Sequence, residues 1–317
     1  MKFDFNDINL VPKKCIVTSR SQCDTSLVLG KQQFQMPIVP ANMECVIDES
    51  IAIKLAQNGF FYIMHRFTNT FEFSKKMKEL NIFISISVGV NKESKDLLSN
   101  LKDNSIYPEF ITIDIAHGHS IQTEEMCKYI KDIFPDTFLI AGNISTPEAV
   151  IDLESWGADA TKVGIGPGSA CTTYPATGFG SRNCQASVIH ECSKVAKKPI
   201  IADGGIKEPG DIAKSLVMGA TMIMVGGMLS VYHDSPGHVI EYDGKKYKEF
   251  WGSASQYQSN KSNRIEGKKI LVDYKDQTLL EGYQYLKECL QSSISYGGGT
   301  NLSCFDYVKW ISHQKGF

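Results

Sequence analysis

The chain lacks a long apolar stretch and an excess of charge of either sign. No apolar run approaches the roughly 20 residues that span a bilayer, and the start, Met1–Asp7, lacks the apolar core of a signal peptide. The 317 residues include 33 Lys and Arg against 35 Asp and Glu, so neither nucleic acid nor a membrane is expected as a partner. A small anionic ligand would need a local binding site, because the protein surface as a whole is not basic.

Paired cysteine motifs are also missing. The nine cysteines, an odd number, are scattered without CxxC or CxxH spacing. Without a signal sequence this favours reduced thiols over disulfides or a zinc site. We therefore expect a cytoplasmic protein, in which a catalytic role for any cysteine must be argued from its neighbours.

Eight short apolar runs recur with steady spacing and predict eight strands. Most begin roughly 22–27 residues apart, the length of one strand-plus-helix unit. The alternation predicts an α/β fold, a closed (β/α)8 barrel in one domain over residues 1–317, with a doubly wound open sheet as the alternative. The runs are Pro37–Pro40, Phe60–Met64, Ile82–Val88, Phe110–Ala116, Thr137–Ala141, Ala160–Gly164, Pro199–Asp203 and Thr221–Val225.

Helix-start signals lie between the runs. Ser145–Glu148 combines capping residues with a proline in the first turn. Asp48 and Glu208–Asp211 open two further helices, and a last helix is expected over Thr278–Ser293. Glycines are expected to end three of these helices: Gly59 ends the helix that begins after Asp48, Gly157 the one after Ser145, and Gly219 the one after Glu208.

Three segments depart from this regular alternation of strands and helices. The longest interval follows the sixth strand, and its excess, residues 164–180, falls on the barrel face that carries active-site loops. A second irregular stretch is expected from about Ser230 to Asp276, and its polar part, Ser253–Asn263, is predicted to be a mobile flap. The first 35 residues are expected to cover the barrel bottom or a neighbouring subunit.

Cys171 stands out among the nine thiols because of its loop. Gly164, Gly166 and Gly168 precede it at intervals of two, which suits either a tight turn or backbone groups converging on a ligand or cation. The hydroxyls of Thr172–Thr173 follow directly. A thiol in such a polar, glycine-rich loop can be exposed and activated, so Cys171 is the predicted nucleophile.

Two glycine pairs end the seventh and eighth strands, Gly204–Gly205 and Gly226–Gly227. In barrels the turns after these strands often bind phosphate through backbone N–H groups. Asp203 precedes the first pair, and a carboxylate can accept hydrogen bonds from two adjacent sugar hydroxyls. Together they indicate a ribose 5′-phosphate; the alternative is a pair of ordinary turns.

Other polar residues carry weaker signals. Asp114 and Asn143 end strands four and five and point to the same mouth, although a strand-end Asp also serves as a helix cap. His117 and His119 are not spaced to share a metal from a helix. Glu266, at the end of the flap, is either a proton carrier near the thiol or a solvated charge.

These residues, in this order, resemble the IMP dehydrogenase/GMP reductase family. The similarity covers nearly the whole chain. The segments that carry it are Pro40–Met43, Asp114–Gly118, Ala141–Asn143, Gly164–Thr173, Ile201–Ile206, Gly210–Lys214, Gly226–Leu229, Tyr247–Ser255, Glu266–Lys268 and Gln291–Tyr296.

Two features favour the bacterial reductase branch of that family. Its dehydrogenases usually carry two regulatory CBS modules after the second strand, whereas here His65–Phe67 leads directly into a short helix. The dehydrogenase flap is also longer and supplies an Arg-Tyr pair that activates water. Here only about ten residues separate Ser255 from Glu266.

The resemblance implies NADPH-dependent reductive deamination of GMP to IMP in purine interconversion or salvage, with release of ammonia. Cys171 would form a covalent thioimidate with C2 of the purine, while Thr173 and Glu266 would protonate the leaving amine. Family members are typically homotetramers, in which the adenosine end of the cofactor reaches a neighbouring subunit. The alternatives are an IMP dehydrogenase without CBS modules and a non-catalytic purine-nucleotide-binding protein.

The resemblance also implies roles for individual residues. Those that match substrate-binding positions are Ser169, Asp203, Gly204, Gly205, Gly226, Gly227, Gly252 and Ser253. Those near the nicotinamide cofactor are Asp114, Ala116, Asn143 and Lys162. Carbonyls around Gly166, Gly168 and Cys171 resemble the potassium-binding loop of the family.

Overall fold

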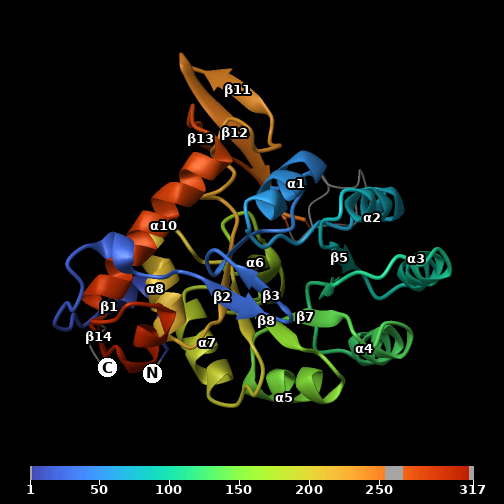
Figure 1. Ribbon diagram of the computed structural model, residues 1–317, viewed down its shortest axis with the longest axis horizontal. Helices are drawn as coiled ribbons and strands as arrows, with labels where there is room; N and C mark the ends of the chain where they lie inside the picture. The colour runs from blue at the N-terminus through green and yellow to red at the C-terminus, as the bar shows by residue number, and fades with distance from the viewer. Residues whose placement is uncertain (1, 254–266, 314–317) are drawn as a thin grey trace.

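Seven parallel strands form the central sheet of the computed structural model, which describes residues 2–253 and 267–313 (Figure 1). Their order is β4-β10-β9-β8-β7-β6-β5, so the first and last strands pair with each other. A doubly wound sheet would hold its first strand in the interior, so this order excludes it and confirms the α/β barrel. The strands are β4 (Ile38–Pro40), β5 (Ser85–Val88), β6 (Phe110–Asp114), β7 (Phe138–Ile144), β8 (Ala160–Val163), β9 (Ile200–Asp203) and β10 (Met222–Val225).

The eighth position of the barrel, next to β5, is taken by residues 60–64. Met64 forms an isolated parallel bridge with β5, and its N–H donates to the carbonyl of Ser85 over 3.1 Å. A regular strand over the whole of this run was expected, and that expectation is wrong. The hydroxyl of Tyr62 donates to the carbonyl of Phe83 (2.6 Å) and accepts the N–H of Ser85 (3.2 Å), so a side chain replaces part of the backbone ladder.

The helices begin largely where the capping signals predict. The Asp48 side chain accepts the N–H of Ile51, and Thr146 caps the helix that opens with Pro147. No described helix is both long and apolar enough to cross a membrane. The helices are α1 (Glu49–Gln57), α2 (Thr70–Glu79), α3 (Lys92–Asp103), α4 (Ile121–Ile133), α5 (Pro147–Ser155), α6 (Thr173–Thr177), α7 (Gln185–Ser193), α8 (Pro209–Val217) and α10 (Leu279–Tyr296).

Aromatic side chains close the barrel at the amino-terminal ends of its strands. The hairpin of β2 (Leu27–Leu29) and β3 (Gln32–Phe34) inserts Phe34, whose ring centroid lies 5.0 Å from that of Phe61 and 6.1 Å from that of Phe110. This confirms that part of the first 35 residues covers the barrel bottom, so a ligand must enter at the other end. The short elements at the chain ends are η1 (Phe5–Asp7), β1 (Ile8–Leu10), η2 (Arg20–Gln22), η3 (Leu302–Tyr307) and β14 (Trp310–Ser312), of which β1 and β14 pair antiparallel.

A three-stranded antiparallel sheet follows β10 and stands at the top of Figure 1. It contains β11 (Val239–Tyr242), β12 (Lys245–Trp251) and β13 (Lys269–Asp273). The expectation of an irregular stretch over Ser230–Asp276 is therefore wrong. Many residues of these strands are exposed and polar, so the apolar alternation that reveals a strand is weak. The expected flap, Ser253–Asn263, lies outside the described residues except for its first residue.

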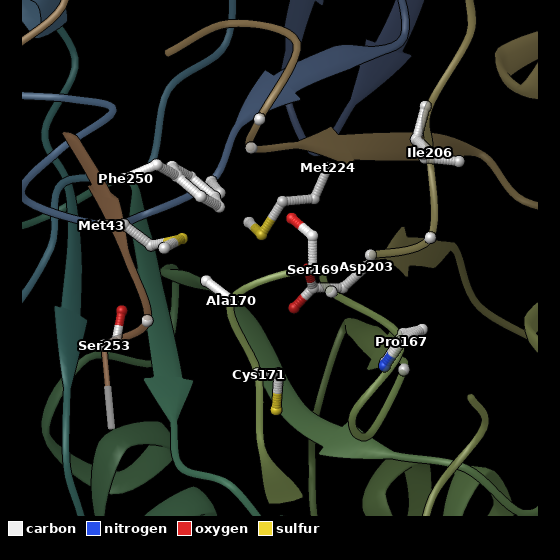
Figure 2. Close-up of a pocket in the computed structure, with 18 of the residues that line it drawn as sticks. Met43, Pro167, Ser169, Ala170, Cys171, Asp203, Ile206, Met224, Phe250 and Ser253 are labelled. Carbon is white, nitrogen blue, oxygen red and sulfur yellow. The ribbon is translucent and has the colours of Figure 1, made fainter. Parts of the chain in front are cut away.

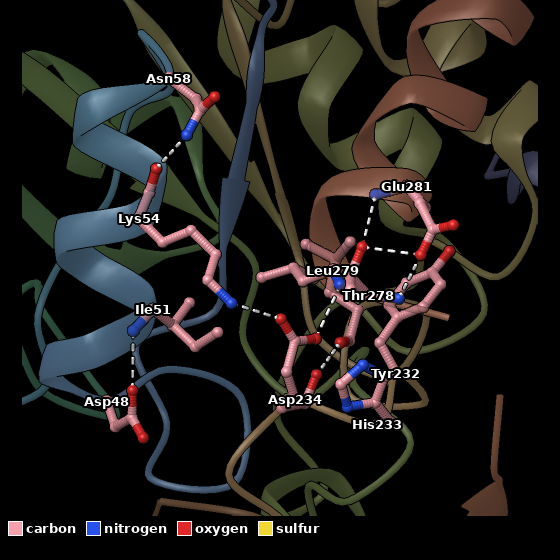
Figure 3. A network of polar contacts seen from close by, with 12 residues as sticks. Asp48, Ile51, Lys54, Asn58, Tyr232, His233, Asp234, Thr278, Leu279 and Glu281 are labelled. Atoms are coloured by element: carbon pink, nitrogen blue, oxygen red, sulfur yellow. Dashed lines mark hydrogen bonds and ion pairs between the residues drawn. The ribbon is translucent and has the colours of Figure 1, made fainter. Parts of the chain in front are cut away.

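Asp234, in the segment between β10 and β11, links two helices (Figure 3). Its carboxylate accepts one hydrogen bond from the ammonium of Lys54 on α1 (2.6 Å) and another from the backbone N–H of Leu279 on α10 (2.7 Å). Burial alone would raise the pKa of Asp234, but the hydrogen bonds from Lys54 and Leu279 hold this pKa below its usual value. Beside it, the ammonium of the buried Lys248 on β12 donates to the backbone carbonyls of Tyr232, His233 and Ser235.

Replacing Asp234 by Ala should lower the free energy of unfolding by about 2–3 kcal/mol, because it removes two charge-assisted hydrogen bonds. Since the folded-state pKa is depressed, this contribution is present above the unfolded pKa and is lost as the pH falls through the folded one. Urea unfolding at neutral and acidic pH measures both effects. The control is Asp136→Ala, which removes an exposed pair with Lys31 and should cost less than about 0.5 kcal/mol. Equal losses in the two variants would contradict the anchoring role.

Candidate active site

A cavity of about 1280 Å³ opens at the carboxyl ends of the barrel strands (Figure 2). Every predicted site residue that the structure describes lines it, while Glu266 lies outside the described residues. The barrel thus gathers residues from the ends of five strands, β6 to β10, and from the loop after β12 at one mouth. The lining includes Asp114, Ala116, Asn143, Lys162, Gly166, Gly168, Ser169, Cys171, Thr173, Asp203, Gly204, Gly205, Gly226, Gly227, Gly252 and Ser253.

The Cys171 thiol lies in a loop that is held from two sides. Its Sγ donates to the hydroxyl of Thr173, the first residue of α6, over 3.2 Å. Cys171 also forms an isolated antiparallel bridge with Gly267, and the N–H of Lys268 donates to the carbonyl of Ala170 over 2.9 Å. The loop after β8 therefore pairs with the segment that directly follows Glu266 in the chain.

The turns after β9 and β10 present backbone groups to the cavity. Gly204 and Gly205 have φ angles of +88° and +82°, which glycine adopts without strain and which can turn successive N–H groups toward one side. A Cβ on Gly227 would meet nothing within 4 Å, so the space over this residue is open. Such turns suit an anion such as a phosphate.

A buried cation lies between two carboxylates at the floor of the cavity. The ammonium of Lys162 is 2.7 Å from Oδ2 of Asp203 and 3.1 Å from Oδ1 of Asp114. Burial alone would lower the pKa of Lys162, but Asp203 and Asp114 raise it above its usual value. Burial would likewise raise the pKa of Asp114, and the charges of Lys162 and Arg66 hold it below its usual value. Lys162 and Asp114 are therefore both charged at neutral pH.

Three further side chains support the site, and the sequence did not single them out. The buried Gln185 of α7 donates to the carbonyls of Val163 (2.8 Å) and Asp203 (3.2 Å), which ties the ends of β8 and β9 together. Asn42 and Arg66 line the cavity. Both follow predicted strands, the same position that drew attention to the polar residues after strands four and five, so that signal could have found them.

The fold and the site define a class of protein: a barrel enzyme with a thiol, a neighbouring hydroxyl and two glycine turns at one mouth. Comparison with known families narrows the class. Residues 2–307 match the family described as IMP dehydrogenase / GMP reductase domain. The chain belongs to this family, which confirms the resemblance seen in the sequence.

Its relatives include several bacterial enzymes named GMP reductase. The chain is 54% identical to that of Clostridium acetobutylicum over 314 residues, which cover 98% of this chain and 95% of the relative. Identity is 52% over 311 residues to that of Lactobacillus delbrueckii subsp. bulgaricus (98% and 94%) and 51% over 314 residues to that of Bacillus subtilis (98% and 95%). The similarity therefore extends over nearly the full length of both chains.

Replacing Gly164 by Ala should destabilise the protein by at least about 3 kcal/mol, because a Cβ there would lie 1.9 Å from the carbonyl oxygen of Asp203. The matched control is Gly178→Ala. Gly178 also has a positive φ, of +79°, but open space around it, so only about 1 kcal/mol of backbone strain is expected. Denaturant midpoints compare the two. A Gly164 variant as stable as the control would refute the close packing of β8 on β9.

Proposed function

We propose that this chain is an NADPH-dependent GMP reductase, which converts GMP to IMP with release of ammonia. The observation that carries the proposal is the Cys171–Thr173 pair, with Sγ 3.2 Å from Oγ1, at the mouth of a barrel whose close relatives are named GMP reductase. The activity places the enzyme in purine interconversion and salvage.

The glycine turns and Asp203 are the proposed nucleotide site. The phosphate lies against the backbone of Gly204–Gly205 and Gly226–Gly227, and the ribose hydroxyls donate to the carboxylate of Asp203. Ser169, Gly252 and Ser253 line the same cavity as the thiol, and Figure 2 shows Ser169 and Ser253 at the cavity together with Cys171.

Cys171 supplies the nucleophile in the proposed reaction. Its thiolate adds to C2 of the purine, and the C2 amino group leaves as ammonia after accepting a proton from the pair formed by Thr173 and Glu266. A thioimidate bond then joins Sγ to C2. Hydride addition at C2 breaks this bond and returns the thiolate, so GMP, NADPH and two protons become IMP, NADP⁺ and ammonium.

The residues beside the nucleotide site fit a nicotinamide. Among the described residues, the buried Oδ1 of Asn143 and Nε of Arg66 have no hydrogen-bond partner, and a carboxamide offers both a donor and an acceptor. Asp114, Ala116 and Lys162 line the same part of the cavity. NADPH, when bound there, supplies the hydride. These side chains orient it and keep water from C2.

We further propose a potassium ion at the carbonyls of Gly166, Gly168 and Cys171. Rings of main-chain carbonyls suit this ion, and the positive φ of Gly166, +77°, shapes the loop. No group of three or more His, Cys, Asp or Glu in the described part of the chain could bind a metal ion. A cation here would therefore rely on carbonyl ligands.

The whole chain is proposed to act as one catalytic domain in a cytoplasmic homotetramer. Residues 164–180 form its catalytic loop and residues 230–276 its flap region, and no CBS module interrupts the chain between residue 64 and α2.

All nine cysteines are free thiols, as a reducing compartment favours. Ile121 and Ile151, 76% and 52% exposed on α4 and α5, offer apolar surface for subunit contacts. Light scattering in solution measures the assembly.

Replacing Cys171 by Ala should reduce turnover at least about a thousandfold while GMP binding stays within about threefold, because the thiol acts in the covalent step. NADPH absorbance and IMP formation after GMP addition measure turnover, and calorimetry measures binding. Cys15→Ala, at an exposed thiol, is the control and should keep full activity. NADH formation from IMP and NAD⁺ would instead identify a dehydrogenase, and GMP binding without turnover by the unaltered enzyme would identify a binding protein.

Replacing Gly227 by Ala should raise the KM for GMP about tenfold without loss of stability, because the new methyl group projects into open space over the phosphate turn. Guanosine, which lacks the phosphate, should bind this variant and the unaltered enzyme equally. An equal loss of affinity for both ligands would place the phosphate elsewhere.

A further inference from the structure

Among the described residues, Lys162 of β8 is the most enclosed charged group at the mouth of the barrel. Its side chain is 3% exposed, so its contacts are with protein atoms. Its ammonium reaches Asp203 at the end of β9 (2.7 Å) and Asp114 at the end of β6 (3.1 Å). One buried cation therefore joins a residue of the proposed ribose site to a residue of the proposed nicotinamide site.

The same contacts fix the orientation of the Asp203 carboxylate. Lys162 and the side-chain amide of Asn143 both donate to Oδ2, each over 2.7 Å. Asn143 is itself held by the carbonyl of Gly164 over 2.6 Å. Within the described parts of the chain no hydrogen bond ends on Oδ1 of Asp203, and this side chain is 19% exposed at the cavity. One oxygen is thus anchored and the other is available to a ligand.

Two other polar side chains border the cluster on its far side. The charge of Arg66 and a hydrogen bond from Asn42 act on Asp114. Among the described residues, Lys162 is the charged side chain that pairs with Asp203. An amide alone, from Asn143, would leave the buried carboxylate without a counter-charge.

We propose that Lys162 is a positioning residue for substrate selection: it holds Asp203 so that the free oxygen accepts the ribose hydroxyls and favours ribonucleotides over 2′-deoxyribonucleotides. The inference rests on the proposed GMP site and deepens it. A site built to accept a hydroxyl discriminates against the analogue that lacks it, because its acceptor is then left unpaired. The discrimination depends on the carboxylate being held in one orientation.

The test is Lys162→Met, which keeps the length of the side chain and removes its charge. Calorimetry with GMP and with 2′-deoxy-GMP, both without cofactor, gives the ratio of their dissociation constants. The unaltered enzyme should prefer GMP by about tenfold or more. The variant should bind GMP about tenfold more weakly and lose most of this preference, whereas a lysine with a merely structural role would leave the ratio unchanged.

Lys131→Met is the matched control. Lys131 of α4 also pairs with a partly buried aspartate, Asp159, but at the opposite end of the barrel, ahead of β8. This variant should lose stability and keep the preference for GMP. If Lys162→Met keeps the same preference as this control, the proposal is overturned.

A second background covers the case in which Lys162→Met does not fold. Asp114→Asn removes one of the two carboxylates that pair with Lys162, so the double variant leaves one carboxylate without its lysine partner instead of two. Adding Lys162→Met to this background should still abolish the preference for GMP, and an unchanged ratio would overturn the proposal. An unaltered enzyme that binds no GMP would instead overturn the proposed function, and one that binds GMP and 2′-deoxy-GMP equally would overturn this inference alone.

Discussion

Parallel pairing of the strands in chain order, with the last beside the first, is the constraint on which the rest of the structure depends. It places the carboxyl end of every strand at the same mouth of the barrel. The carboxyl ends of β6, β7, β8 and β9 therefore meet there although they are far apart in sequence. The hairpin of β2 and β3 fills the opposite end with Phe34. Chemistry is confined to one side because the other side is packed.

The second constraint is that a buried charge needs a partner of opposite charge. At the floor of the cavity this requirement binds Lys162 to Asp114 and Asp203 and so fixes the geometry of the polar residues beneath the ligands. Gln185 and the close approach of Gly164 to the backbone of Asp203 hold β8 and β9 in register below this cluster. The thiol loop adds the reactive group, and its pairing with Gly267 joins it to the flap region.

The regular parts of this architecture could be predicted from the sequence, because apolar runs and helix caps are local signals. Seven of the eight expected strands and the helices after Asp48 and Ser145 agree with the structure. The prediction of a regular strand over Phe60–Met64 was wrong because the hydroxyl of Tyr62 makes hydrogen bonds that backbone groups make in a regular strand. The sheet of β11, β12 and β13 was missed because its strands carry exposed, charged residues. Lys162 could not be placed between its carboxylates, since their meeting depends on strand order rather than on spacing.

The central claim is that Cys171 attacks C2 of a purine nucleotide whose ribose is held by Asp203 and whose phosphate is held by the two glycine turns. A crystal structure of the protein with GMP tests it most directly. The account predicts Sγ of Cys171 within about 3.5 Å of C2, an approach distance for bond formation, with the ribose hydroxyls at Asp203. A nucleotide bound with its phosphate, rather than its base, at the thiol would contradict the account.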